Sequence, residues 1–70
     1  MRHIIYLDTW QPKEGGWHAV VIGGLPYGVN ISAGPCSTQQ SAIDQVIVRI
    51  HDRHLHVDDL VIYTNGRKAS

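Results

Sequence analysis

The pattern of apolar and polar positions is dominated by two short apolar runs, each followed by an Asx-type residue. Residues 4–7 precede Asp8, and residues 60–64 precede Asn65. Runs of this length that are apolar at successive positions, and therefore on both faces, are typical of interior strands. We expect strands over residues 2–9 and 60–64, each with a polar side chain at its end.

Two further strands are predicted between these runs. Residues 17–22 are rich in β-forming side chains, and residues 27–32 alternate apolar and polar positions. Each segment follows a turn, at residues 11–16 and 23–26, where proline fixes φ and glycine supplies positive φ. The first three strands are therefore expected to form an antiparallel meander.

The pattern changes to helical spacing after the meander. Ser37 and Gln40 have the spacing of a capping box, in which side chains satisfy amides of the first turn. An apolar stripe at helical spacing follows, made of Ile43, Val46, Ile47, Ile50 and His54. We expect a helix over residues 38–54.

The resulting order, β-β-β-α-β, predicts an α+β fold in a single domain over residues 1–70. A helical crossover makes the fourth strand parallel to the first, so one parallel strand joins the antiparallel meander. The helix is expected to pack on one face of this sheet. The arrangement places Asp8 and Asn65 side by side.

Length and charge narrow the range of functions. A chain of 70 residues forms one small domain with a marginal core. Six Lys and Arg balance six Asp and Glu, which does not favour nucleic-acid binding, because that binding needs excess positive charge.

Cys36 is the only cysteine, as expected in a reducing compartment. With no apolar leader and no run long enough to span a bilayer, we expect a cytoplasmic protein without a membrane partner.

Several segments resemble parts of the ribonuclease H fold. Residues 4–8 and 15–20 resemble its first hairpin, in which an aspartate closes strand one and a Gly-Gly-Trp-x-Ala run opens strand two. Residues 32–34 and 38–40 resemble the end of strand three and the start of the first helix, and residues 60–65 resemble strand four. The chain is therefore similar to the first half of this fold, which implies the same β-β-β-α-β core.

The same core resembles the partial ribonuclease H domain of HicB-type antitoxins. That domain also has a Gly-Gly-aromatic hairpin and a Leu-Pro pair like Leu25-Pro26. It has a threonine and acidic residues at the start of the helix, where this chain has Thr-Gln-Gln at residues 38–40. The resemblance implies a small interaction or regulatory module, either antitoxin-like or a phage-type inhibitor of a host protein.

Catalysis in the ribonuclease H family uses three carboxylates that hold two divalent ions. The resemblance aligns the first with Asp8 and places the others at Ile43 and Asn65. Asp44 follows Ile43, but one residue is about 100° of helical rotation, so its side chain should point away from Asp8. We expect no catalytic residues and no metal cofactor, with Asp8, Asp44 and Asn65 as remnants of a site. A degenerate metal-dependent nuclease or nucleic-acid-binding domain is the alternative.

Three histidines form a second candidate cluster. His51, His54 and His56 could share a metal, since the first two are three residues apart on the predicted helix. The simpler interpretation is that His54 closes the apolar stripe and that His51 lies near the helix C-terminus, where the dipole favours a cation. We expect these structural roles.

Cys36 is a third candidate, as a nucleophile with His18 or His3 as its base, because a cysteine just before a helix can be activated. A lone loop cysteine is more often inert, and nothing in the sequence pairs this one with a base. We expect an unreactive thiol.

The aromatic residues offer a surface on which single-stranded nucleic acid could stack. The residues concerned are Tyr6, Trp10, Trp17 and Tyr27. Because the net charge is zero, we favour roles as core or interface anchors instead.

The two doubly apolar strands predict a binding surface. One helix can cover only one face of the sheet, so the other apolar face needs a partner. A second copy, joined through sheet faces or an edge strand into a homodimer or larger homo-oligomer, is the simplest; a different protein is the alternative. The residues expected at this interface are Ile5, Leu7, Trp10, Trp17, Val61 and Tyr63.

Overall fold

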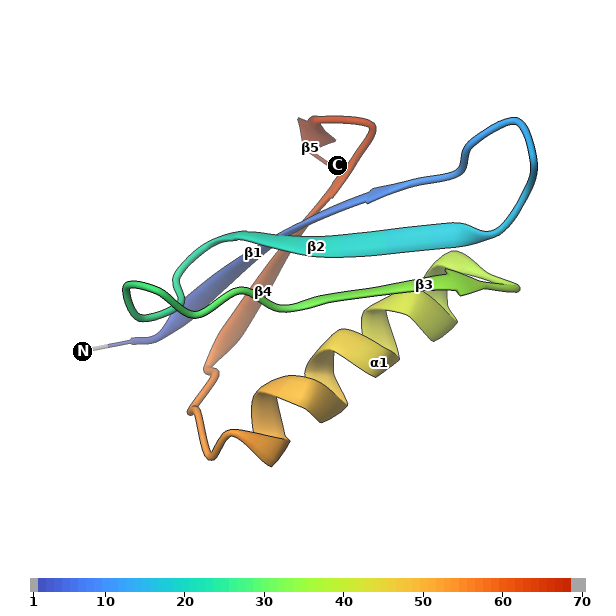
Figure 1. Cartoon of the computed structure of the whole chain (residues 1–70). Helices are drawn as coiled ribbons and strands as arrows, with labels where there is room; N and C mark the ends of the chain where they lie inside the picture. The colour runs from blue at the N-terminus through green and yellow to red at the C-terminus, as the bar shows by residue number, and fades with distance from the viewer. Residues whose placement is uncertain (1, 69–70) are drawn as a thin grey trace.

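The computed structural model describes residues 2–68 as a twisted mixed sheet with one helix on one of its faces (Figure 1). In chain order the elements are β1 (Ile4–Trp10), β2 (Trp17–Gly23), β3 (Ser32–Cys36), α1 (Gln39–Asp52), β4 (Asp59–Thr64) and β5 (Arg67–Lys68). The strand order is β3-β2-β1-β4-β5, with β1 parallel to β4 and the other pairs antiparallel. The predicted α+β fold and its topology are confirmed.

The central strand β1 divides its side chains between the two faces of the sheet. Ile5, Leu7 and Thr9 are at most 2% exposed and lie on the face that α1 covers. The intervening residues are less buried and lie on the opposite face, because successive strand side chains alternate. The two strands that are apolar on both faces therefore contribute side chains to both sides of the sheet. Only the side under α1 forms the core.

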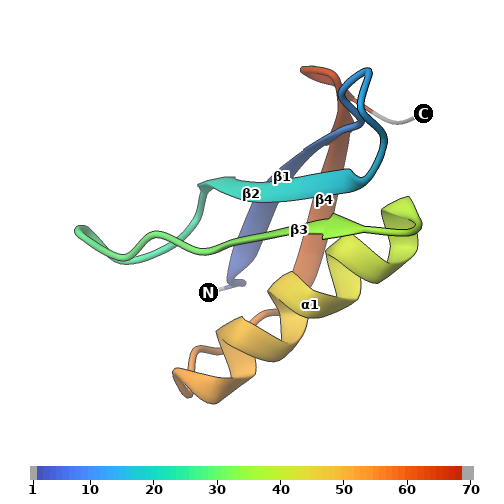
Figure 2. The ribbon, with the colours of Figure 1, turned by 45° about the vertical axis from the view of Figure 1, so that its right-hand side comes forward.

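The core lies between α1 and the strands β1, β2 and β3 (Figure 2). The helix contributes Ala42, Ile43, Val46 and Ile50, all buried. Ile5 and Leu7, which we expected at a partner interface, lie in this core, because alternation puts them on the same face as α1. The hydrophobic effect on this face accounts for most of the stability of a domain this small.

The third strand was predicted at residues 27–32, but β3 is formed by Ser32–Cys36. The predicted segment instead begins with a turn, in which the Val29 amide donates to the Pro26 carbonyl at 3.1 Å and Gly28 has φ of 84°. Pro35 is accommodated within β3 because this is an edge strand, which needs a donor on one side only.

The N-cap of the helix is one residue later than the predicted one, Ser37. Thr38 is the N-cap, and its side chain accepts a hydrogen bond from the Ser41 amide at 3.0 Å. Its extended backbone places the hydroxyl over the third amide of the helix, as an N-cap requires. Gln40 does not complete a box with Ser37; its side chain donates to Asp44 on the helix surface.

The C-terminus of α1 is a Schellman motif. The His54 amide donates to the His51 carbonyl at 2.9 Å, and the Leu55 amide donates to the Ile50 carbonyl at 3.2 Å. His54 has φ of 58°, in the left-handed region, and its side chain is exposed. The prediction that it closes the apolar stripe is wrong, because the helix ends before this residue.

The chain continues beyond the predicted end of the last strand as a hairpin. Asn65 and Gly66 have φ of 53° and 79°, and they connect Thr64 to its partner Arg67 in β5. Two-residue turns with positive φ at both positions fit the twist of paired strands, and Asn-Gly is their preferred sequence. Asn65 therefore has a backbone role in the turn. The resemblance, which aligned Asn65 with a metal-binding position, did not suggest this role.

Candidate functional site

The candidate site is the sheet face opposite α1, which we call the open face. Besides Trp10 at the end of β1, its apolar side chains are the six residues Ile4, Tyr6, Val20, Ile22, Val61 and Tyr63. The part of the chain that the structure describes places no helix over this surface (Figure 2). Two of the six are well exposed, Tyr6 at 37% and Ile22 at 56%.

A β-bulge exposes Ile22. Tyr6 pairs with Gly23 and Leu7 with Val21, so Ile22 is an extra residue in β2. The Tyr6 ring lies over Gly23, where an added Cβ would be 3.3 Å from it. The bulge therefore leaves Ile22 projecting from the open face beside an aromatic ring, a combination typical of interface anchors.

The aromatic residues of the sequence do not form one platform. Trp10 lies on the open face and stacks on His18 of β2, with ring centroids 5.5 Å apart. Trp17, predicted at the interface, instead packs against the core on the α1 side. Tyr27 is fully exposed in the connection between β2 and β3 and belongs to no strand.

The end of β1 meets the β4–β5 turn at a polar corner, as the topology predicts. The Gly66 amide donates to the Asp8 carboxylate at 2.9 Å, and the Asn65 amide donates to the Thr9 carbonyl at 2.8 Å. The adjacency predicted for Asp8 and Asn65 is present. In this arrangement the carboxylate fixes the hairpin turn to the neighbouring strand.

The helix contributes no carboxylate to this corner. Ile43 is buried between α1 and the sheet, whereas Asp44 is exposed and accepts a hydrogen bond from Gln40 at 2.9 Å. Asp8 lies on the open face and α1 on the other, so Asp44 and Asp8 are on opposite sides of the sheet. Within residues 2–68, no three His, Cys, Asp or Glu side chains come together as metal ligands would.

A polar network on the α1 side of the corner was not predicted. The Gln39 side-chain amide donates to the hydroxyl of Thr9 at 2.9 Å and to that of Thr64 at 3.0 Å. The Thr9 hydroxyl, which is fully buried, donates to the Tyr63 carbonyl at 2.7 Å. The first residue of α1 thus links the ends of β1 and β4.

The histidines lie apart from this corner. His51 and His54 are exposed at the end of α1, and His56 bonds to the Asp58 carboxylate at 2.9 Å. The His3 backbone amide donates to the same carboxylate at 2.7 Å and, with His56, holds the pKa of Asp58 below its ordinary value. The contacts that the Asp58 carboxylate makes with His3 and His56 join the start of β1 to the start of β4.

Cys36 is buried in the core cluster, on the side of the sheet that α1 covers. His18, which was considered as its base, stacks on Trp10 on the open face. The structure therefore does not bring these two side chains together.

Comparison with known proteins gives no relative: no family model, curated protein or solved structure matches the chain significantly. None of the helices in residues 2–68 is both long and apolar enough to cross a bilayer.

Proposed function

We propose that the chain is a small, non-catalytic interaction module of the ribonuclease H-like kind, and that it self-associates through the open face. The observation that carries the proposal is the uncovered row of apolar side chains around Tyr6 and Ile22. The regulatory roles implied by the resemblance, antitoxin or inhibitor, both act by binding rather than by chemistry.

A second copy is the occupant that fits this surface best. The chain has zero net charge, so two copies approach without net repulsion. A two-fold axis through the open face would bring the same apolar patch together from both copies, which is the usual geometry of small dimers. It would also enlarge a core that is marginal in a domain of this size.

The polar corner supports the non-catalytic part of the proposal. Asp8 accepts a hydrogen bond from the Gly66 amide, and the residue at the end of β4 is Asn65 in a left-handed turn conformation. Each has a structural function that explains its identity without a metal. A two-ion site would need further carboxylates at this corner, since hard divalent cations prefer several charged oxygen ligands.

The proposal is tested by the mass of the particle in solution, measured by sedimentation over a range of concentrations. We expect a dimer that dissociates on dilution, and we expect Ile22→Lys to shift it to monomer. Val48→Lys is the matched control, because Val48 is 58% exposed against 56% for Ile22 but lies on the outer surface of α1. A monomer at all concentrations, or equal effects of both variants, contradicts the proposal.

A further inference from the structure

The turn between β4 and β5 contains a chemically labile sequence, Asn65-Gly66. An asparagine can lose its side-chain amide when the backbone nitrogen of the next residue attacks the side-chain carbonyl and closes a five-membered ring. A side chain on that next residue hinders the attack, and glycine has none. Gly66 lies in open space, since a Cβ added to it would have no heavy atom within 4 Å.

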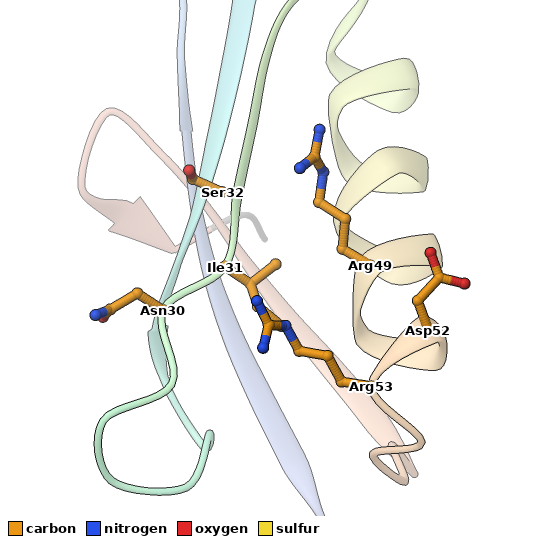
Figure 3. A pocket seen from close by; sticks show the side chains of 6 residues that line it. All are labelled: Asn30, Ile31, Ser32, Arg49, Asp52 and Arg53. Carbon is orange, nitrogen blue, oxygen red and sulfur yellow. The ribbon is translucent and has the colours of Figure 1, made fainter.

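The other asparagine of the chain, Asn30, lacks these features. Both asparagines are exposed, and Figure 3 shows the Asn30 side chain turned away from α1. Asn30 precedes Ile31, a β-branched residue that is 3% exposed and belongs to the core. The branched side chain crowds the Ile31 nitrogen, and its burial fixes the backbone there. Asn30 is therefore an internal reference for Asn65.

Hydrogen bonds to the end of β1 restrain the reacting nitrogen in the folded protein. The Gly66 amide donates to the Asp8 carboxylate at 2.9 Å. The Asn65 amide donates to the Thr9 carbonyl at 2.8 Å. Attack requires the Gly66 nitrogen to lose its proton, and a carboxylate beside it disfavours the negative charge that this loss creates. Ring closure also requires the peptide plane between Asn65 and Gly66 to rotate out of the turn conformation, which breaks the bond to Asp8.

We propose that Asn65 is a site of spontaneous deamidation and that Asp8 slows this reaction in the folded protein. When the turn opens, a hydroxide ion takes the Gly66 amide proton, and the nitrogen bonds to Cγ of Asn65. The bond between Cγ and Nδ2 breaks, and Nδ2 takes a proton from water and leaves as ammonia. Water then opens the ring at one of its two carbonyls. The product is aspartate or, with the backbone running through the side chain, isoaspartate.

Either product changes the corner at the end of β1. Aspartate adds a second negative charge to the turn that Asp8 binds. Isoaspartate lengthens the backbone of a two-residue turn, which disrupts the pairing of Thr64 with Arg67. The hydrogen bond between Asp8 and Gly66 therefore preserves both the net charge of the chain and the position of β5.

The experiment is incubation of the full chain at mildly alkaline pH, followed by peptide mass spectrometry that detects conversion of amide to acid at each asparagine. One sample is kept in native buffer and one in concentrated urea, where the contact with Asp8 is lost. We expect Asn65 to convert about tenfold faster in urea, the factor that corresponds to the loss of one charge-assisted hydrogen bond. Asn30 should convert much more slowly than Asn65 in both samples.

Asp8→Ala tests the residue responsible. In native buffer this variant should convert at Asn65 about tenfold faster than the wild type, and in urea the two should convert at the same rate. Asp44→Ala is the matched control, because it removes an exposed carboxylate from α1 and should follow the wild type in both conditions. Val46→Ala weakens the core under α1 and controls for a general loss of stability. It should accelerate conversion less than Asp8→Ala.

The comparison of the wild type in native buffer and in urea stands by itself when Asp8→Ala does not fold. In that case Asp8→Asn, which keeps an acceptor oxygen and removes the charge, takes its place and should also convert faster than the wild type. The proposal is overturned when Asn65 converts no faster than Asn30, or when urea does not accelerate the conversion. It is also overturned when the Asp8 variant converts in native buffer at the wild-type rate, or no faster than Val46→Ala.

Discussion

At the scale of single residues, the positions that depart from ordinary backbone geometry are the ones with the clearest roles. Within residues 2–68, His54 and Asn65 are the two non-glycine residues with positive φ. Asparagine tolerates this conformation well, and Asn65 begins a hairpin turn that requires it. Histidine, like any residue with a Cβ, adopts this conformation at a cost that glycine avoids, so His54 carries strain at a helix end where glycine is usual.

Replacing His54 by glycine should therefore stabilise the protein. We expect His54→Gly to raise the free energy of unfolding by about 1 kcal/mol, because the left-handed conformation costs an L-residue about 1–2 kcal/mol. Urea unfolding measures the change. His51→Gly is the control: the same substitution inside α1 should lower the free energy by about 1 kcal/mol. If His54→Gly also destabilises, the helix does not end in a Schellman motif.

We expect Asp58 to make the stability depend on pH. The pKa of its carboxyl is lowered from 3.8, first by the hydrogen bond from the His3 amide and then by His56. Because the folded pKa lies below the unfolded one, the stabilisation is complete above the unfolded pKa. It is lost as the pH falls through the folded pKa.

Asp58→Asn should accordingly reduce the free energy of unfolding at pH 7, and the difference from the wild type should shrink toward about pH 2. Urea unfolding at the two pH values measures this. Glu14→Gln, at an exposed turn position, is the control and should show no comparable pH-dependent difference. If Asp58→Asn lowers the free energy of unfolding equally at both pH values, the charge of Asp58 does not have this role.

At the scale of elements, the side chain of Gln39 connects α1 to the sheet. It donates to hydroxyls on β1 and β4, and one of these, on Thr9, is fully buried. Removing the hydrogen-bond partner of a buried polar group lowers the stability of the folded protein. This network also explains how the start of α1 is held at the ends of two parallel strands.

Gln39→Ala should lower the free energy of unfolding by about 1 kcal/mol, the usual net value of a lost buried hydrogen bond. The neighbouring Gln40 bonds only to Asp44 on the exposed surface of α1, so Gln40→Ala should change stability by less than about 0.5 kcal/mol. Denaturant unfolding of both variants provides the comparison. Equal losses would show that the effect comes from the helix surface and not from the link to the sheet.

The elements also show how far the sequence predicts this structure. Periodicity located β1, β2, α1 and β4, because each has a strong apolar pattern and clear turn residues at its ends. It misplaced β3, where the turn after Pro26 overrides an alternating pattern. It omitted β5, although Asn65-Gly66 is a recognised hairpin signal. The Gln39 network was beyond prediction, because it depends on contacts between residues far apart in the chain.

At the scale of the whole molecule, one question that decides function could not be answered from the sequence: which side of each apolar strand the helix covers. Ile5 and Leu7 are as apolar as their neighbours Ile4 and Tyr6, so composition does not distinguish the two faces. The structure puts the first pair under α1 and the second pair on the open face. The expected interface therefore keeps only its members on the open face, Trp10, Val61 and Tyr63.

Self-association through the open face should make the stability depend on protein concentration. When folding is coupled to dimer formation, a higher concentration raises the urea midpoint by mass action. We expect a tenfold increase in concentration to stabilise the folded state by about 1.4 kcal/mol for a fully coupled dimer, which a fluorescence-detected unfolding series can resolve. Ile22→Lys should abolish the dependence and leave a folded monomer, because Ile22 is already more than half exposed and contributes little to the core. Val48→Lys should retain it. A wild-type midpoint that does not move with concentration would show that the open face is not occupied by a second copy.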